Sequence, residues 1–337
     1  MERRAFITLA GAALVGFPRV ARATGGLDIA APESQHAVRV LLASGAFDAP
    51  EPVDSWHFAW NGRTYRGAFD TVTLPDGRRG LLNTLPLDAY LYGVLSKEVS
   101  ASWAPGAQQA QALVARTYAF LKLRPDRSYD VVAGESDQLY GGIESETVEG
   151  RAAVDATAGT IVTYAGLPAR VAYSACCGGR TADAGDVWNT PVPYLTSIVD
   201  PHCVGTPGFA WQVDVPCGQV ASAFGSAFAG IGKLRSVDVR CDDPSARPRG
   251  IAFVGASSTF ETTPKAFRNA LGPSVIRSAF VHEVSVEGDG TALSVAGTGH
   301  GHGVGLCQWG TRVMGSQGAS GADIVAFYLP GTALGRA

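Results

Sequence analysis

The sequence predicts a mixed, loop-rich α+β fold in which a small β-meander precedes two central helices that form a substrate groove. Glycine and proline are frequent, at 42 and 19 residues, and only 17% of the residues are charged, which is typical of a turn-rich fold rather than a helical bundle. Short strand patterns occupy residues 37–69. Two apolar helical patterns follow within residues 81–123, separated by a short break.

The N-terminus is typical of an export signal. Paired arginines at positions 3 and 4 precede an apolar run over residues 6–17, and a small-x-small cleavage pattern follows at residues 21–23. The Arg-Arg-x-Phe-Ile order indicates a twin-arginine signal, with an ordinary secretion signal or a membrane anchor as alternatives. We expect residues 1–23 to be this signal and residues 24–36 a linker, which places the mature protein in the periplasm or elsewhere outside the cytoplasm.

The first elements after the linker are expected to be strands. Residues 37–43 and 54–60 have strand patterns, and Asn61-Gly62 after the second is a strong two-residue hairpin signal. Residues 63–69 then pair back on the preceding strand.

The two central helices meet at a carboxylate. Pro86 and Pro105 are each followed by helix formers, so each is expected in a first turn, where its missing N–H costs nothing. Glu98 ends the first helical pattern and therefore lies at the corner between the helices. Loss of hydration in such an apolar corner raises the pKa of a carboxyl group towards the range of a general acid.

The second helix, residues 105–123, is apolar around most of its circumference, which indicates a buried helix. Arg116 is the exception within it. A buried guanidinium requires a partner, so a structural ion pair and a functional role are both open for this residue.

The rest of the chain alternates helical and strand patterns. We expect helices at residues 146–157, 220–228, 264–271 and 322–328, a hairpin from residues 160–164 and 169–174, and strands at residues 234–240, 250–254 and 281–295. Neither an internal repeat nor a low-complexity linker is evident. One domain over residues 37–334, with an insertion near residues 204–280, is therefore expected.

The charge balance limits the partners. The formal net charge is −3 and the chain has no long basic run, which gives no support for nucleic acid or an anionic membrane surface as a main partner. After the signal, no stretch approaches the roughly 20 apolar residues of a membrane span, so the mature protein is not expected to be integral to a membrane.

Six cysteines are present, and an even number in an exported chain favours disulfides over metal. Their spacing is not that of a zinc finger, and we expect no metal and no other cofactor. The pairing is open, because six cysteines allow fifteen pairings. A cysteine hydrolase is an alternative, with Cys176 or Cys177 as nucleophile and His300 or His302 as base, although adjacent cysteines in an oxidising compartment favour a bridge.

Residues 299–310 combine alternate glycines with chemistry-bearing side chains. Glycine permits positive φ and close backbone approach, while Gln308 and Trp309 offer a hydrogen-bonding amide and a flat apolar face that suit a sugar ring. A tight turn that covers a core is an equal alternative. His300 and His302 form a His-x-His pair that could hold a metal, but no third ligand is evident nearby.

Several motifs occur in one order along the chain: LPLDAYLYGV at 85–94, Glu98, QA…ARTYA at 111–119, QLYGG at 138–142, YS…GGRT at 173–181, DVW at 186–188, PYL at 193–195, FR…LG…SAF at 267–280, and GHGHGVG…QWG…Y…PGT at 299–332. In this order they resemble the SpoIID/LytB domain family. The resemblance covers about residues 38–332.

The resemblance implies a bacterial cell-wall protein. Sporulation members of the family are lytic transglycosylases that cleave glycan strands stripped of stem peptides, at the MurNAc-GlcNAc bond, and leave 1,6-anhydro-MurNAc ends. The other branch comprises amidase enhancers, which promote a partner hydrolase. The expected function is therefore a lytic transglycosylase acting on peptidoglycan glycan strands; the alternative is a glycan-binding enhancer of a cell-wall amidase that does not itself cleave.

The resemblance also implies site residues. Glu98 matches the catalytic glutamate of the family, and a transglycosylase that uses the substrate's own C6 hydroxyl needs only one such carboxylate, whereas hydrolysing glycosidases normally need two. Arg116 matches an arginine implicated in function, and direct pairing with Glu98 would lower the pKa of the acid, so we expect Arg116 to bind substrate or a neighbouring loop. The remaining residues expected to bind substrate are Gln138, Ser174, Gly178, Gly179, His300, His302, Gln308 and Trp309.

The chain departs from the family pattern at its metal ligands. Some members bind zinc through a histidine and two cysteines near the glycine corner that the YS…GGRT motif forms. Here only Cys177 falls at a matching place, and Val171 and Asp183 stand where the other ligands are expected. Zinc is therefore not carried over from the resemblance.

Overall fold

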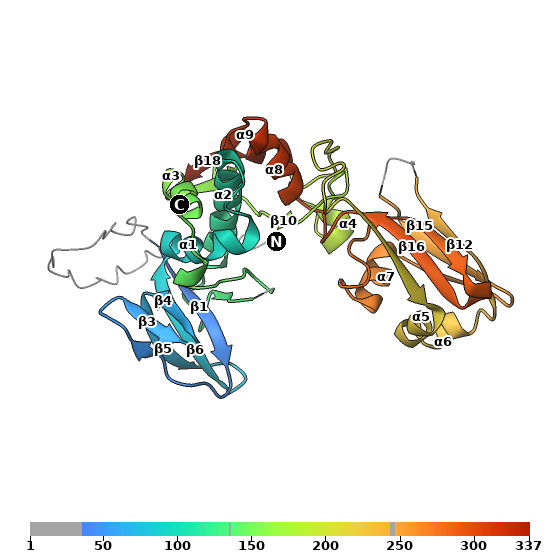
Figure 1. Cartoon of the computed structure of the whole chain (residues 1–337), viewed down its shortest axis with the longest axis horizontal. Helices are drawn as coiled ribbons and strands as arrows, with labels where there is room; N and C mark the ends of the chain where they lie inside the picture. The colour runs from blue at the N-terminus through green and yellow to red at the C-terminus, as the bar shows by residue number, and fades with distance from the viewer. Residues whose placement is uncertain (1–35, 135, 243–246) are drawn as a thin grey trace, which may run out of the picture. The chain divides into compact units, whose positions relative to one another are not determined.

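The computed structural model describes residues 36–134, 136–242 and 247–337. The expected signal at residues 1–23 and almost all of the expected linker at residues 24–36 lie outside this part of the chain. The described residues form a mixed α+β fold with several small sheets, as the sequence predicted (Figure 1).

The N-terminal portion is a set of antiparallel strands that leads into the helices. These strands are β1 (Ala37–Ser44), β2 (Glu51–Pro52), β3 (His57–Trp60), β4 (Arg63–Arg66), β5 (Ala68–Thr73) and β6 (Arg79–Pro86). Asn61 and Gly62 both have positive φ at the β3–β4 turn, which confirms the predicted hairpin. The central strand β6 pairs with β5 and β1 and runs directly into the first helix.

The helical centre consists of α1 (Leu87–Glu98) and α2 (Pro105–Lys122). Pro105 begins α2 as expected, whereas Pro86 is the N-cap of α1 rather than a first-turn residue. One side of α2, including Leu113 and Val114, packs into one apolar cluster, and another, including Ala115 and Ala119, packs into a second. The near-continuous apolar surface of α2 therefore reflects burial on both sides.

The middle of the chain connects these helices to the C-terminal segment. Its elements are β7 (Val131–Val132), the short 3₁₀ helix η1 (Ile143–Ser145), α3 (Val148–Ala156), β8 (Thr160–Tyr164), β9 (Leu167–Pro168), β10 (Tyr173–Ser174) and α4 (Ala184–Trp188). The predicted pairing of residues 160–164 with 169–174 is wrong. β8 pairs with β9 and β18, because Ala165 and Gly166, both at positive φ, turn the chain back earlier, and β10 instead pairs in parallel with β17.

Residues 210–298 contribute most of a separate apolar cluster. Its elements are β11 (Ala210–Pro216), α5 (Cys217–Phe224), α6 (Ser226–Ala229), β12 (Leu234–Arg240), β13 (Gly250–Gly255), β14 (Thr259–Thr262), α7 (Pro264–Leu271), β15 (Val281–Glu287), η2 (Gly288–Gly290) and β16 (Ala292–Thr298). They form two three-stranded sheets, in the orders β11-β16-β15 and β12-β13-β14, whose core includes Phe253, Phe267 and Val295.

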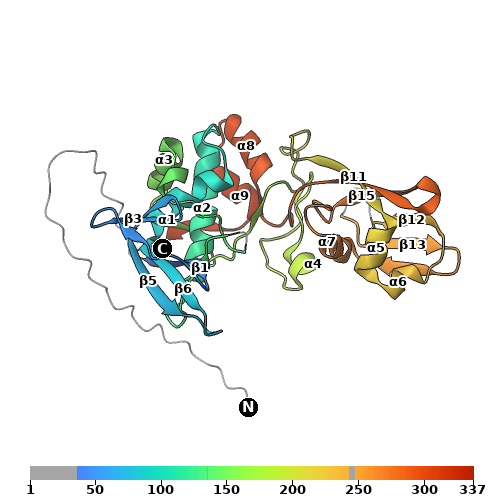
Figure 2. The ribbon, with the colours of Figure 1, turned by 60° about the horizontal axis from the view of Figure 1, so that its bottom comes forward.

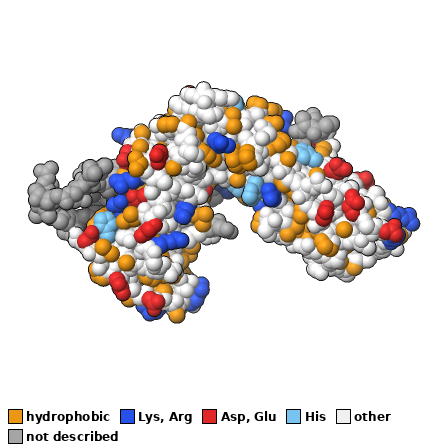
Figure 3. Space-filling view, in the orientation of Figure 1, with side chains coloured by type: hydrophobic (Ala, Val, Ile, Leu, Met, Phe, Trp, Pro, Cys, Tyr) orange, Lys and Arg blue, Asp and Glu red, His pale blue; other side chains and the backbone are white. Residues whose placement is uncertain are grey.

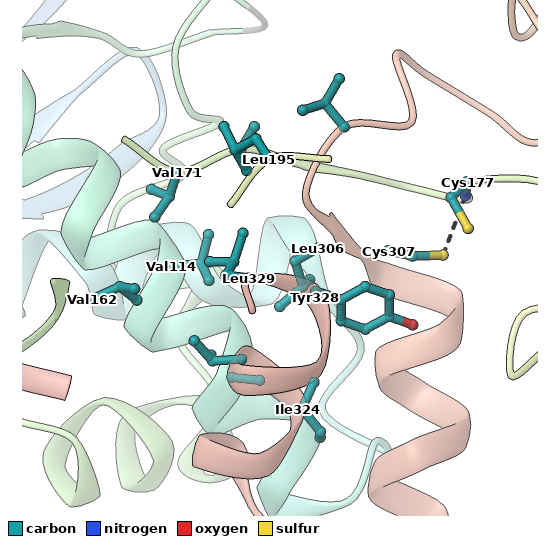
Figure 4. Close-up of a cluster of buried hydrophobic side chains, with 14 of the residues drawn as sticks. Val114, Val162, Val171, Cys177, Leu195, Leu306, Cys307, Ile324, Tyr328 and Leu329 are labelled. Atoms are coloured by element: carbon teal, nitrogen blue, oxygen red, sulfur yellow. Dashed lines mark hydrogen bonds between the residues drawn. The ribbon is translucent and has the colours of Figure 1, made fainter. Parts of the chain in front are cut away.

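The C-terminal segment returns to the helical centre. It comprises β17 (Leu306–Cys307), α8 (Gln308–Ser316), α9 (Gly321–Tyr328) and β18 (Ala333–Arg336). Both α8 and α9 contact α2, as Figure 2 shows. Figure 4 shows Val114, Ile324 and Leu329 in the core that these helices share.

Two further features concern the surface charges and the length of the helices. On the face drawn in Figure 3, acidic and basic side chains are interspersed. None of the helices within the described ranges is both long and apolar enough to cross a bilayer.

Candidate active site

Glu98 is the last residue of α1 and is half-buried at the start of the break before α2. The Gln308 amide Nε2 donates to Glu98 Oε2 at 3.2 Å, and Tyr173 and the backbone of Leu139 also hydrogen-bond to this carboxyl group. Burial raises the pKa of Glu98 above its ordinary value, and the hydrogen bonds oppose part of that rise. The carboxyl group is thus held in position and is biased towards its protonated form.

Tyr173 is fixed by a second layer of contacts. Gln138 Nε2 lies 3.3 Å from Tyr173 Oη and 3.3 Å from the Ala115 carbonyl, while Tyr90 Oη donates to Gln138 Oε1 at 3.3 Å. Gln138 is only 1% exposed, so the expectation that it binds substrate is corrected. Its amide is committed to protein groups, and it positions Tyr173.

Two tryptophans contact each other close in sequence to Glu98 and to its partner Gln308. Trp103 belongs to the break that follows Glu98, and Trp309 follows Gln308 at the start of α8. Their ring centroids are 6.0 Å apart, and the Arg312 guanidinium lies over the Trp309 ring. Partly exposed aromatic rings offer apolar faces on which a sugar ring can pack.

His302 is next to Tyr173 in space. Its Nδ1 accepts a hydrogen bond from the Val304 N–H at 3.0 Å, which assigns the ring proton to Nε2, and its ring lies 5.2 Å from that of Trp188. Burial lowers the pKa of His302 to about 4, so the ring is neutral at neutral pH. His300 is exposed, and its backbone pairs with Cys176.

The Ser174–Gly179 corner forms loop structure. Ser174 is buried and its Oγ accepts from the Gly303 N–H at 3.2 Å. Gly178 and Gly179 have φ of +78° and +91°, and a side chain at Gly178 would meet the backbone of Thr298. Ser174 and Gly178, which were expected to bind substrate, instead hydrogen-bond to Gly303 and Thr298 and hold the corner against that segment.

Arg116 lies away from any substrate-binding surface. It is 0% exposed, and its Nε donates to Asp88 Oδ1 at 2.6 Å. Its other nitrogens donate to the Val154 carbonyl, Thr157 Oγ1 and the Thr160 carbonyl. The expected substrate contact is therefore corrected, because each nitrogen of Arg116 donates to Asp88, to the end of α3 or to the segment that follows it.

A pocket of about 990 Å³ is lined in part by His302. Gly301, His302 and Trp188 line one part of it, and α7 lines another. The charged residues of its wall are Arg180, Asp183, Asp186, Arg247, Arg249, Lys265 and Arg268. Basic groups therefore outnumber acidic ones, which suits a ligand that carries negative charge.

Comparison with known proteins shows which sequences this chain is similar to. Residues 76–164 match the SpoIID family model, described as Stage II sporulation protein. Over this span the chain is similar to the SpoIID family. The matched span contains Glu98, Arg116 and Gln138, and the other predicted site residues lie after it.

Curated relatives extend the similarity beyond that span. The chain is 29% identical over 277 residues to an uncharacterized protein of Brachyspira hyodysenteriae, with 81% of this chain and 73% of the relative covered. It is 25% identical over 276 residues to Stage II sporulation protein D of Bacillus subtilis, with 76% of each chain covered. It is 27% identical over 295 residues to the amidase enhancer of Bacillus subtilis, with 72% of this chain but only 40% of the relative covered.

The structure brings Glu98, Gln308, Trp309 and His302 into one region, although Glu98 lies more than 200 residues before the other three in the sequence. Sequence reasoning gave no role to Tyr173 and Trp103. Both were visible in the sequence, Tyr173 within a family motif and Trp103 five residues after Glu98. Neither position alone indicates that Tyr173 hydrogen-bonds to the Glu98 carboxyl group or that Trp103 packs against Trp309.

Proposed function

We propose that this protein is a lytic transglycosylase that cleaves denuded peptidoglycan glycan strands. The observation that carries the proposal is the Glu98 carboxyl group, whose raised pKa keeps a proton available and whose position is fixed by Gln308 and Tyr173. A general acid requires both properties, a proton held near the working pH and a defined direction for its transfer.

The proposed reaction uses one carboxyl group twice. Protonated Glu98 gives its proton to the glycosidic oxygen as the bond from that oxygen to muramic acid C1 breaks. The C6 hydroxyl of the same sugar then bonds to C1, and the Glu98 carboxylate takes the hydroxyl proton. The products are a new non-reducing GlcNAc end with a free C4 hydroxyl and a 1,6-anhydro-MurNAc end, and the enzyme returns to its protonated state without consuming water.

The surroundings of Glu98 support a glycan as ligand. Trp103 and Trp309 pack against each other, and Trp309 directly follows Gln308, the hydrogen-bond partner of Glu98. The pocket that His302 lines adds Trp188 together with an excess of basic side chains. Each muramic acid of a denuded strand carries a free lactyl carboxylate, whereas a stem peptide converts that group to a neutral amide. An excess of basic side chains suits these lactyl carboxylates.

Glu98→Gln is the decisive variant. It keeps the shape of the side chain and removes the transferable proton, so the release of anhydromuramyl products from denuded strands should fall about 10²- to 10⁴-fold, as measured by mass spectrometry. Glu149→Gln, an exposed glutamate at the start of α3, is the matched control and should keep wild-type activity. Unchanged turnover in Glu98→Gln would rule out the proposed role.

A glycan-binding enhancer of a cell-wall amidase is the second candidate, and the similarity to the amidase enhancer favours it. In that case wild-type protein releases no anhydro ends, yet it accelerates a purified amidase on intact sacculi, and Glu98→Gln does so equally well. Both candidates require export to the cell wall. A fusion of residues 1–36 to a reporter should reach the periplasm, and replacement of Arg3 and Arg4 by lysine tests the twin-arginine route.

A further inference from the structure

Four buried side chains from three distant segments converge behind the active site. They are Cys177, Asp200, Cys203 and Cys307, and each is 0% exposed. One ligand atom from each, three sulfurs and a carboxylate oxygen, lies within 4.8 Å of all the others. Figure 4 shows Cys177 and Cys307 facing each other at the edge of the core, near Tyr328.

The spacing of these atoms matches a tetrahedral metal centre. With zinc–sulfur bonds of about 2.3 Å, two thiolates on one ion lie roughly 3.8 Å apart. Cys177 Sγ lies 3.5 Å from Cys203 Sγ and 3.1 Å from Asp200 Oδ2. All six cysteines of the chain fall within the described ranges and carry free thiols, so no disulfide competes for these sulfurs in the structure.

Backbone and side-chain groups donate hydrogen bonds to the cluster, as such groups commonly do to the ligands of a metal ion. Amide N–H groups point at two of the sulfurs: Gly179 donates to Cys203 Sγ at 3.2 Å, and Cys177 donates to Cys307 Sγ at 3.2 Å. Tyr328 Oη donates to Asp200 Oδ2 at 2.9 Å. Such outer hydrogen bonds orient metal ligands and stabilise their anionic forms.

Charge balance also calls for a cation. A buried carboxylate and buried thiolates are costly unless positive charge compensates them. The Arg247 guanidinium donates to the carbonyls of Cys177 and Arg180 and supplies one positive charge at this place.

We propose that Cys177, Asp200, Cys203 and Cys307 bind one Zn²⁺ ion in a closed structural site. Three thiolates select a soft or borderline ion, and four protein ligands leave no open position for catalysis. The site differs from the one that the family resemblance implies: Val171 is buried in the core, and Asp183 caps α4 through the Gly185 N–H at 2.7 Å. The expectation of a chain without metal rested on sequence spacing, which does not show this convergence.

The ion would tie together three parts of the active-site wall. Cys177 lies in the glycine corner, Asp200 and Cys203 lie in the loop before β11, and Cys307 is the N-cap of α8. Gln308 follows Cys307 directly and donates to Glu98. Zinc bound to Cys307 therefore fixes the start of α8 and the amide that orients the carboxyl group.

Metal analysis of the purified full chain tests the site without any activity assay. Protein produced with zinc in the medium and purified without chelator should contain one Zn²⁺ per chain. After zinc removal and reduction under anaerobic conditions, one equivalent of Co²⁺ should produce visible absorption bands together with thiolate-to-cobalt charge transfer. Wild-type protein that holds no zinc and, once reduced, binds no Co²⁺ would overturn the proposal.

Variants assign the ligands. Cys203→Ser, Cys307→Ser and Asp200→Asn should each lower zinc affinity at least tenfold, and Tyr328→Phe should lower it about tenfold through the outer hydrogen bond. Cys217→Ser and Cys241→Ser, which lie outside the cluster, should retain one ion. Cys176→Ser is the sharpest control, because its thiol adjoins Cys203 and Cys307 but is not in the proposed set. Loss of the ion in Cys176→Ser would refute this ligand assignment, and circular dichroism of each variant separates lost binding from lost folding.

Discussion

Opposing interactions set the protonation of Glu98. Burial disfavours the carboxylate, while Tyr173, Gln308 and the Leu139 backbone favour it by hydrogen bonding, and the net pKa is raised. Because Gln138 and Tyr90 in turn hold Tyr173, the balance depends on buried residues that touch no substrate. The pKa of the proposed acid thus depends on several side chains rather than on Glu98 alone.

This raised pKa makes stability depend on pH. Between the ordinary and the raised pKa the folded protein binds more protons at Glu98 than the unfolded chain does, so its stability falls as pH rises through that window. Glu98→Gln carries no charge and escapes this loss. Scanning calorimetry should therefore show the melting temperature of Glu98→Gln rising relative to that of wild type as the pH increases above the ordinary glutamate pKa. A difference that stays constant with pH would show that the carboxyl group is not desolvated.

At the scale of elements, an ion pair joins the two central helices. Arg116 of α2 and Asp88 of α1 are 0% and 1% exposed, and Arg116 also holds the end of α3 and the start of β8 through two carbonyls. The angle at which α1 meets α2, and hence the place of Glu98, depends on this contact. The motif residue that resembles a functional arginine is in this structure a positioning residue.

Replacing Arg116 by methionine tests that role. The variant leaves Asp88 buried without its partner, which should cost about 3–5 kcal/mol of unfolding free energy in urea titrations. Arg240→Met removes one member of the exposed Arg240–Glu261 pair and should cost less than about 1 kcal/mol. Equal small losses in both variants would contradict a structural role for Arg116.

At the scale of the whole molecule, the candidate site draws on segments from most of the chain. Glu98 comes from α1, Tyr173 from β10 and Gln308 from α8. The basic residues of the pocket wall come from the glycine corner, α7 and the segment before β13. The pocket's excess of basic groups is small and local, in a chain with net charge −3. Its effect on ligands is therefore expected at short range.

Lys265→Glu probes the pocket. Lys265 is exposed at the start of α7 and lines the pocket, so charge reversal should weaken the binding of denuded glycan about fivefold at low salt and less at high salt. Lys233→Glu, outside the pocket, should bind as wild type does. Isothermal titration with strands whose lactyl carboxylates have been amidated should show no difference between wild type and Lys265→Glu. A difference that persists with the amidated strands would exclude carboxylate recognition.

The sequence by itself determined the α+β class, the central helices, the β3–β4 hairpin and the identity of Glu98 as the residue of interest, because turn chemistry, apolar periodicity and motif order are local properties. Only the tertiary structure decided which side chains surround Glu98, that Arg116 and Gln138 face inward, that β10 pairs with β17, and that Cys177, Asp200, Cys203 and Cys307 meet. Those outcomes depend on contacts between segments up to about two hundred residues apart, and the packing of the complete core selects among the many pairings that local patterns allow.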